Sequence, residues 1–373
     1  MSKRLTPPFR ADIVGSFLRP QRIKDARKAY SSGTIDAASL RNVEDECVKE
    51  LVGQQKAAGL QVITDGEYRR AYWHLDFFWG FQGIEHVELD HGYYFHDLET
   101  AHGSIRLSGK ISGEKHPFVE HFKFIKPLES SGVIARQTMP APAQLYAELF
   151  RDDNGKATRR IYPDDKRLIE DIAAAYRQVI KDLYAAGCRN IQFDDCTWGM
   201  VCDTDYWKQR NNSAYDLQRL QETYLTVNNL ATAGRPADLT LTTHVCRGNY
   251  NSSWAAKGGY DAVAATLFAR EDVDAFYLEY DDYRSGGFEP LASVPDGKTV
   301  VLGLITTKRP QIEDKQTVEQ RIREASRYVP LDRLCLSPQC GFASCEIGNK
   351  LTADDQWRKI ALVRAIAADV WGE

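Results

Sequence analysis

The sequence predicts a single (β/α)8 TIM barrel over residues 1–373, with a β-hairpin inserted after the second strand. Eight short apolar segments recur along the chain, and patterns with helical spacing separate most of them. Polar or chemically reactive residues follow the ends of most of these segments, as they do at the mouth of such a barrel. A doubly wound open sheet is the weaker alternative, because no G-x-G-x-x-G follows the first segment.

The predicted elements alternate between strand and helix. The strands cover residues 11–17, 60–67, 133–138, 190–196, 239–246, 275–280, 299–305 and 334–337. Apolar residues three or four positions apart predict helices over 36–58, 164–186, 213–233, 259–267, 314–328 and 353–370. Gly59 and Gly187 follow the first two of these helices directly, as glycine commonly does at a helix C-terminus.

Residues 72–130 interrupt this alternation. The segment is rich in aromatic residues, glycine and histidine, and polar and apolar residues alternate over 84–89 and 104–111. That alternation predicts a β-hairpin lying over one end of the barrel. Its first aromatic residues either line the mouth of the barrel or pack the hairpin against it.

The composition is ordinary for a globular protein. Apolar residues make up 43% of the chain, charged residues 27%, and the net charge is −4, so we expect no nucleic-acid or anionic-membrane partner. No apolar run approaches the ~20 residues of a bilayer span. Residues 1–10 lack the apolar core of a signal peptide. Eight cysteines in so long a chain do not indicate a disulfide framework, so we expect a cytoplasmic protein with reduced thiols. A homo-oligomer is compatible with the sequence but not indicated by it.

Four residues that can bind a metal follow three of the predicted strands. His244 and Cys246 project from the same face of strand 239–246, because alternate residues of a strand do so. Glu279 lies at the end of the next strand, and Cys340 follows the last one. Imidazole, thiolate and carboxylate are ligands of zinc, so we predict a zinc site. The alternative is that both cysteines and the imidazole are ordinary buried core side chains.

Six segments resemble the cobalamin-independent methionine synthases, in the same order along the chain. The zinc-binding segments of that family resemble Thr243-His244-Val245-Cys246, Leu278-Glu279 and Ser337-Pro338-Gln339-Cys340-Gly341. Its I-G-S-F, H-G-E and Q-I-D-E motifs resemble Val14-Gly15-Ser16-Phe17, Asp65-Gly66-Glu67 and Gln192-Phe193-Asp194-Asp195. The resemblance runs from about Asp12 to Val370, and the chain looks like the short branch of the family, with the catalytic barrel alone.

The resemblance implies methyl transfer to homocysteine, giving methionine, from methyl-folate or another methyl donor. Glu67 and Asp194 match positions that bind the ammonium group of homocysteine, and we predict them as catalytic residues. Ser16 matches the position that receives the carboxylate. The weaker alternative for Glu67 and Asp194 is that they are ordinary buried carboxylates paired with Arg69, Arg70 or Arg136. Ser16 could equally be a turn hydroxyl.

The predicted ligands suit the activation of a thiol. A free thiol has a pKa of about 8.5 and is mostly protonated at neutral pH. A Zn²⁺ ion stabilises the thiolate. Two cysteine thiolates and a carboxylate already donate negative charge to the metal, so a bound substrate sulfur keeps its nucleophilicity. Glu279 is the hardest of the four ligands, and we expect it to loosen when the substrate sulfur arrives.

Two positions depart from the long enzymes of the family. Lys308 stands where those enzymes have the histidine assigned to proton transfer. Tyr146 and Glu148 occur where a tryptophan that stacks on the pterin is expected. Lys308 is therefore predicted to meet an anionic group of the donor or acceptor, or else to lie in a solvated basic turn.

Other functions are compatible with the same residues. One is a zinc-dependent transferase that joins another thiol to a non-folate electrophile, as epoxyalkane–coenzyme M transferases do. Another is a zinc lyase or hydrolase with Asp194 or Asp195 as the base. Thiolate-rich ligation disfavours the second, because it weakens the Lewis acid. A binding protein regulated by metal is the non-enzymatic alternative.

Overall fold

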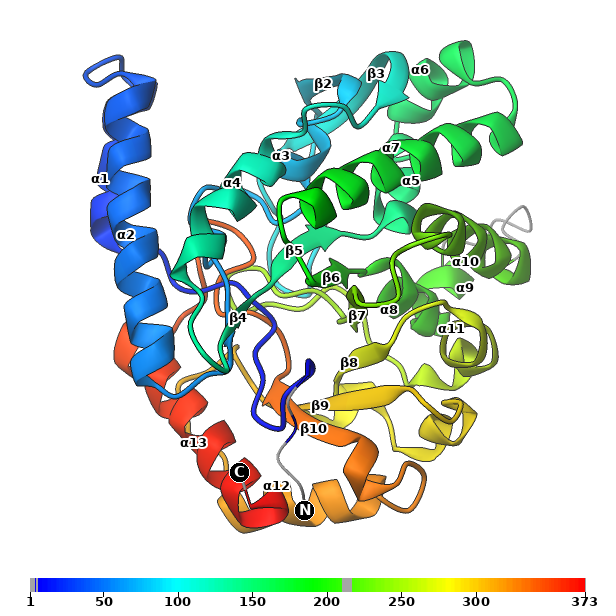
Figure 1. Ribbon diagram of the computed structural model, residues 1–373. Helices are drawn as coiled ribbons and strands as arrows, with labels where there is room; N and C mark the ends of the chain where they lie inside the picture. The colour runs from blue at the N-terminus through cyan, green and yellow to red at the C-terminus, as the bar shows by residue number, and fades with distance from the viewer. Residues whose placement is uncertain (1–3, 5, 210–216, 373) are drawn as a thin grey trace.

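The computed structural model describes residues 4, 6–209 and 217–372. Short parallel strands surround a central axis and helices lie outside them, which confirms the predicted barrel fold (Figure 1). Six strands form one parallel sheet in the order β10-β9-β8-β7-β6-β5. They are β5 (Gln137–Pro140), β6 (Asn190–Asp194), β7 (Thr240–Val245), β8 (Ala275–Glu279), β9 (Thr299–Ile305) and β10 (Leu334–Pro338). Almost all their residues are buried, as expected for parallel strands covered on both faces.

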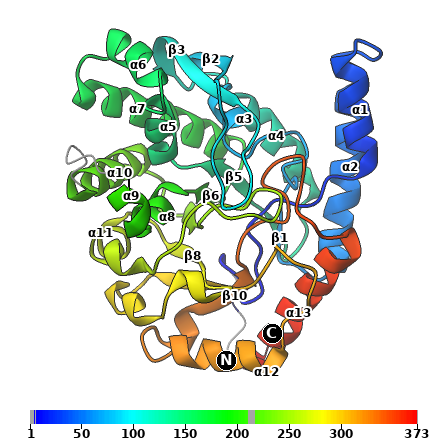
Figure 2. The same cartoon turned by 180° about the vertical axis from the view of Figure 1, so that it is seen from behind.

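The remaining barrel strands are very short. The predicted strand over 60–67 contains β1 (Val62–Ile63), and the one over 133–138 is split into β4 (Ile134–Ala135) and β5. β1, which is labelled in Figure 2, pairs in parallel with β4. The backbone N–H of Arg136, between β4 and β5, still donates to the Ile63 carbonyl at 2.8 Å. The two-strand pair therefore continues towards the six-stranded sheet.

The prediction of a first strand over residues 11–17 is wrong. Only Ala11 forms a bridge, to Leu336 of β10. Further along this segment, side chains bind the carbonyl groups that a neighbouring strand would bind: Arg136 donates to Ile13 and Gln192 to Val14. The segment nevertheless spans the opening between β10 and β1. The Asp12 N–H donates to Leu336 at 2.9 Å, and the Phe17 N–H donates to Gly66 at 3.1 Å.

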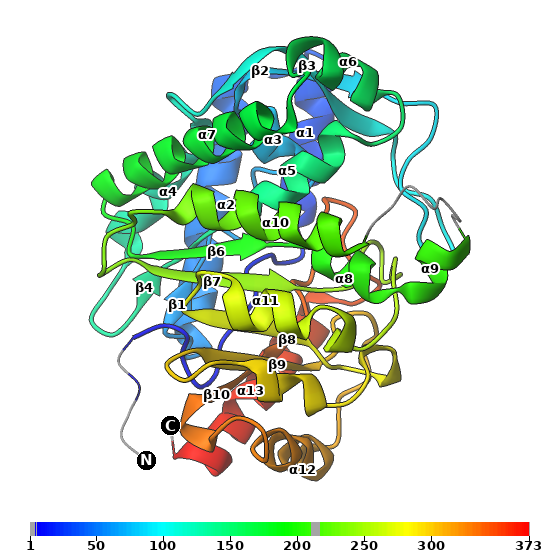
Figure 3. The ribbon, with the colours of Figure 1, turned by 90° about the vertical axis from the view of Figure 1, so that its right-hand side faces the viewer.

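The helices cover the outside of the strands (Figure 3). They include α1 (Gln21–Ser31), α2 (Ala37–Ala57), α5 (Pro142–Leu149), α6 (Asn154–Ile161), α7 (Asp165–Ala185), α8 (Thr197–Cys202), α9 (Thr204–Gln209), α10 (Leu217–Thr232), α11 (Ala264–Arg270), α12 (Lys315–Ala325) and α13 (Ala353–Trp371). Asp36 and Asp164 cap α2 and α7 by accepting backbone N–H groups, and Thr352 forms a capping box at α13. None of the helices in the described ranges is both long and apolar enough to cross a bilayer.

Most predicted helices agree with the structure to within three residues. The helix expected over 259–267 is instead a 3-10 turn, Tyr260–Ala262, followed by α11. The expected start of another helix at residue 213 lies outside the described residues, and α10 is described from Leu217. Its end at Thr232 agrees with the prediction.

The insertion after β1 contains the predicted hairpin. β2 (Gln82–Glu88) pairs antiparallel with β3 (Gly103–Ser112), flanked by α3 (Leu75–Phe78) and α4 (Pro117–Ile125). β3 packs against α6 and α7. The loop between β2 and β3 reaches the segment after β7, where the His96 ring stacks on Trp254 with 4.3 Å between ring centroids. The insertion thus covers part of the barrel end where the predicted site residues lie.

Arg136 forms a buried ion pair in the barrel interior. Its guanidinium pairs with Asp12 at 2.9 Å and donates to the Tyr277 hydroxyl at 2.6 Å and to the Gln192 side chain at 3.2 Å. Together with its bond to Ile13, these contacts join the N-terminal segment to β6 and β8. The side chains of Arg136 and Asp12 are both completely buried.

Replacing Arg136 by Met should lower the free energy of unfolding by about 3–5 kcal/mol, because the buried Asp12 carboxylate would lose its counter-ion. The measurement is urea unfolding followed by circular dichroism. The matched control is Arg167→Met, which breaks an exposed ion pair with Asp171 on α7 and should cost under about 1 kcal/mol. Equal effects of the two changes would contradict the proposed importance of the interior pair.

Candidate functional site

Three of the four predicted metal ligands meet at the ends of β7 and β10. His244 and Cys246 lie at the end of β7, and Cys340 follows β10 by two residues. One nitrogen of His244 and the two sulfurs all lie within 4.8 Å of one another, and all three residues are buried. Strand ends that are far apart in sequence thus place one imidazole and two thiols around a common point.

The surroundings of these residues favour a bound cation. Neither ring nitrogen of His244 has a hydrogen-bond partner, although the residue is only 2% exposed. A buried polar group without a partner is uncommon and costly. Hydrogen bonding to a neighbouring thiol, together with burial, raises the pKa of both Cys246 and Cys340 well above the usual value. Both can be thiolates together only beside a compensating positive charge, and one nitrogen with two sulfurs is a donor set that suits zinc.

Glu279, the fourth predicted ligand, is not part of this group of three. Its Oε1 lies 3.1 Å from Arg284 and 3.2 Å from Lys308, and its Oε2 accepts the backbone N–H of Arg247 at 2.6 Å. Burial alone would raise the pKa of Glu279, but Lys308, Arg247 and Arg284 hold it at about 2. The carboxylate is therefore ionised and charge-compensated, and it is close enough to Cys246 to raise the pKa of that thiol.

Lys308 does not lie in a solvated turn, which was the alternative considered for it. Its side chain is 9% exposed, and its Nζ lies 3.2 Å from Glu279 and 3.7 Å from Asp281. Two carboxylates thus compensate its charge. The structure places Lys308 beside the proposed metal ligand Glu279 rather than at the protein surface.

Glu67 and Asp194 form a pair of buried carboxylates beside the metal-ligand group. Glu67 Oε1 accepts from the Thr138 hydroxyl at 2.9 Å and pairs with Arg70 at 3.3 Å, whereas its Oε2 has no partner. Asp194 accepts from Gln192 at 2.9 Å. Burial and the nearby Glu67 carboxylate raise the pKa of Asp194 well above its usual value. The nearby positive charges therefore do not fully compensate the negative charge that these two carboxylates would carry when both are ionised.

The pairing of these carboxylates with arginine, which was an open alternative, holds only in part. Arg70 does pair with Glu67. Arg136 pairs instead with Asp12, and Arg69 pairs with residues of α2. Burial still raises the pKa of Glu67, despite the nearby positive charges. A further cation would therefore be stabilised in this place.

A strained turn follows β1 and positions Glu67. Gly66 and Glu67 both have positive φ angles, 66° and 60°. This left-handed conformation is uncommon for a residue other than glycine, and such residues concentrate at functional sites. Here the turn brings the Glu67 carboxylate to Thr138 of β5.

Ser16 lies against the loop that follows Cys340. Its hydroxyl accepts the Ala343 N–H at 3.3 Å, and its carbonyl accepts the Phe342 N–H at 2.9 Å. A Cβ atom added to Gly341 would lie 1.9 Å from the hydroxyl oxygen of Ser16, so only glycine allows this close approach. Since the next residue, Phe17, bonds to Gly66, Ser16 also lies beside the turn that carries Glu67.

The predicted site residues therefore form a continuous arc. Asp194 lies directly opposite His244 in the β6–β7 register. The Glu67 carboxylate is close enough to Asp194 to raise the pKa of that residue. Ser16 lies between the turn that carries Glu67 and the loop that follows Cys340. The arc can bind a soft cation at one point and an ammonium group next to it.

Sequence reasoning left Cys196 unassigned, although it lies at this site. Its sulfur is 3.3 Å from the sulfur of Cys246. A signal was available in the sequence: Cys196 follows Asp194 by two residues, as Cys246 follows His244. Because Asp194 lies opposite His244, the residues two positions further along each chain segment, Cys196 and Cys246, also come close together.

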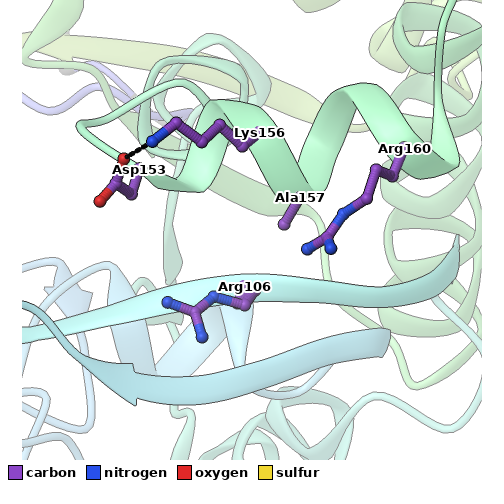
Figure 4. A pocket seen from close by; sticks show the side chains of 5 residues that line it. All are labelled: Arg106, Asp153, Lys156, Ala157 and Arg160. Carbon is purple, nitrogen blue, oxygen red and sulfur yellow. Dashed lines mark hydrogen bonds and ion pairs between the residues drawn. The ribbon is translucent and has the colours of Figure 1, made fainter.

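Two clefts on the outside of the barrel are separate from this site. One, of about 520 Å³, lies between β3 and α6 and is lined by Arg106, Asp153, Lys156, Ala157 and Arg160 (Figure 4). The other, of about 760 Å³, is lined mainly by α7 and α10. Neither shares a residue with the arc.

Several known proteins are similar in sequence to this chain over most of its length. The family model described as "Cobalamin-independent synthase, Catalytic domain" matches residues 9–86 and 156–361. The uncharacterized protein YxjG of Bacillus subtilis is 43% identical over 99% of this chain and 96% of its own length. A methionine synthase of Saccharolobus solfataricus is 21% identical, over 90% of this chain and 88% of its own.

Two solved structures extend the comparison. A Listeria monocytogenes protein assigned as a vitamin-B12 independent methionine synthase is 37% identical, with a TM-score of 0.77 over 98% of this chain and 99% of that one. A B12-independent methionine synthase from Shewanella sp. W3-18-1, in complex with selenomethionine, shares the fold at 19% identity, with a TM-score of 0.72 over 96% of each chain. The match to the family model and the close relatives agree with the motifs, and the chain belongs to the cobalamin-independent methionine synthase family.

Proposed function

We propose that the protein transfers a methyl group to the thiol of homocysteine and so forms methionine, with zinc as its metal. The observation that carries this proposal is the juxtaposition of two incompletely compensated carboxylates, Glu67 and Asp194, with the His244, Cys246 and Cys340 group. A ligand with an ammonium at one end and a thiolate at the other matches this arrangement. Family membership supports the same reaction, and the Shewanella relative binds selenomethionine, the selenium analogue of the product.

The metal would be held by His244, Cys246 and Cys340, with Glu279 as a fourth ligand. When bound, zinc supplies the positive charge that keeps the substrate sulfur ionised at neutral pH. The two cysteine thiolates keep electron density on that sulfur. Arg284 and Lys308 keep the Glu279 carboxylate ionised, which is the form that a metal ion would bind.

The amino-acid end of homocysteine is oriented by the rest of the arc. The unpartnered Oε2 of Glu67 and the carboxylate of Asp194 would bind the ammonium. The Ser16 hydroxyl, which already accepts a hydrogen bond from one backbone N–H, can donate a hydrogen bond to the substrate carboxylate. Lys308, whose Nζ lies 3.2 Å from Glu279, would supply positive charge to an anionic group of substrate or donor.

The structure favours a donor other than a stacked folate. Glu148 is fully buried and accepts from Tyr93 and from Ser104 of the insertion. Tyr146 packs on Phe150, with 4.9 Å between ring centroids. These residues stand where a pterin-stacking ring was expected, and both are engaged in packing. Transfer of a different alkyl group to a thiol is therefore the second candidate function.

Purified protein loaded with zinc should form methionine from homocysteine with at least one methyl donor. Mass spectrometry of the thioether product is the measurement, with methyl-folate, a methylcorrinoid protein and small methylated compounds as donors. Coenzyme M with an epoxide tests the second candidate in the same assay. Absence of any thioether with every donor would contradict the proposal.

Cys246→Ser and Cys340→Ser should each weaken zinc binding by roughly a hundredfold or more, since even changes outside the ligands cost ~10–100-fold. Metal content after dialysis and competition with a chelator measure this. The matched control is Cys335→Ser, a buried cysteine on the same strand as the Cys340 loop but outside the ligand group. Stoichiometric zinc in either ligand variant would refute the assignment of that residue.

Glu67→Gln should weaken homocysteine binding by roughly tenfold to a hundredfold, because a charge-assisted hydrogen bond is worth about 1.5–3 kcal/mol. Titration calorimetry on the zinc-loaded protein measures it. Binding of 4-mercaptobutanoate, which lacks the amino group, should change little. Glu44→Gln, which alters a carboxylate paired with Arg69 outside the site, is the control variant. An equal loss for both ligands would argue against an ammonium site at Glu67.

A further inference from the structure

The sulfur of Cys196 touches a metal-ligand sulfur without belonging to the ligand group. The Cys196 and Cys246 sulfurs are 3.3 Å apart, whereas the group of mutually close donor atoms contains only His244, Cys246 and Cys340 among the described residues. Of the eight cysteines, Cys196 is the one that is half-buried, and the other seven are buried. It is thus the most exposed cysteine residue of the chain, and its sulfur lies beside a thiol of the proposed metal site.

Strand register fixes this contact. Asp194 of β6 pairs with His244 of β7, and the Asp195 N–H donates to the His244 carbonyl at 2.8 Å. Cys196 follows β6 by two residues and directly precedes α8, and Cys246 directly follows β7. At this end of the paired strands the two sulfurs lie 3.3 Å apart.

The chain after Cys196 is packed tightly onto Cys246. A Cβ atom added to Gly199 of α8 would lie 2.0 Å from the Cys246 carbonyl oxygen. Before α8, the Asp195 carboxylate accepts the Thr197 N–H at 3.0 Å and the Asn228 side-chain amide at 3.0 Å. Both sides of Cys196 are therefore anchored, and its sulfur does not need a rearranged backbone to approach Cys246.

We propose that Cys196 is a resolving thiol for Cys246 when a peroxide oxidises the site. The peroxide oxygen is transferred to the Cys246 sulfur, which becomes a sulfenic acid while the peroxide is reduced to water or an alcohol. The Cys196 sulfur then attacks the Cys246 sulfur, a disulfide forms, and the hydroxyl leaves with a proton as water. Two thiols are thus oxidised by two electrons and one peroxide is reduced.

The disulfide would protect the site from irreversible damage. Without a second thiol, a sulfenic acid can be oxidised further to sulfinic and sulfonic acids, which thiols do not reduce. The disulfide removes one of the three clustered ligands, so the metal is released. A thiol reductant restores both cysteines, and the metal can bind again. This inference rests on the proposed metal site but not on methyl transfer.

The test treats zinc-loaded protein with hydrogen peroxide and follows zinc release with a chromogenic chelator. Tryptic peptides are then analysed by mass spectrometry. Cys246 lies alone in peptide 220–247, and Cys196 shares peptide 190–208 with Cys202. We expect these two peptides to be linked, one zinc to be released per chain, and dithiothreitol with added zinc to restore the metal content.

Two variants identify the partner of Cys246. In Cys202→Ser the linked peptides should persist. In Cys196→Ser the link should vanish, Cys246 should gain two or three oxygen atoms, and at least about half of the zinc-binding capacity should remain lost after reduction, because those acids are not reduced by thiols.

Three outcomes would overturn the inference: a link between Cys246 and Cys340, a link that survives Cys196→Ser, or full recovery of Cys196→Ser after reduction. Peroxide treatment that leaves both peptides unlinked would overturn it as well. A chain that forms the link but yields no thioether with any donor would sink the proposed function and leave this inference standing.

Discussion

The register between β6 and β7 is the constraint on which the site depends. It places Asp194 opposite His244, and it carries Cys196 to Cys246 two residues later. Side chains alternate between the two faces of a strand, so a shift by one residue would turn these groups away from each other. The buried apolar residues of both strands oppose such a shift, because it would also exchange their core contacts. The geometry of the site is therefore fixed by the same packing that stabilises the barrel.

Charge compensation differs among the buried carboxylates of the barrel. Asp12 is fully paired with Arg136, and Glu279 has two cations and a backbone N–H group. By contrast, Glu67 keeps an unpartnered oxygen, and Asp194 is raised in pKa by a second carboxylate. Buried charge without full compensation is unfavourable, and it persists here where a ligand with an ammonium group would supply the missing charge.

The pattern of apolar and polar residues along the sequence was sufficient to predict most barrel strands and the clustering of three predicted metal ligands. It failed where hydrogen bonds from side chains take the place of those from a neighbouring backbone strand. Seven of the eight predicted strands overlap strands of the barrel, because parallel strands are apolar runs that stop at polar residues. The segment over 11–17 has the same pattern, yet its carbonyl groups bind Arg136 and Gln192, which no periodicity reveals. The partners of Glu279 were also out of reach, since Arg284 and Lys308 come from separate loops. Cys196 could have been found, because the spacing of its strand end matches that of Cys246.

Much of the insertion lies outside the part of the chain that the family model matches. The unmatched residues 87–155 include β3 and α4 of the insertion, and also the barrel strands β4 and β5 with α5. Yet the hairpin loop reaches the chain just after the metal ligands: a Cβ atom added to Gly248 would lie 2.9 Å from the Phe95 ring, and Gly248 follows Cys246 by two residues. The groups that would bind the thiol thus come from the matched barrel, whereas a segment outside the match borders the same strand end. In the proposed reaction, thiol recognition and access to the site would therefore be carried by different parts of the chain.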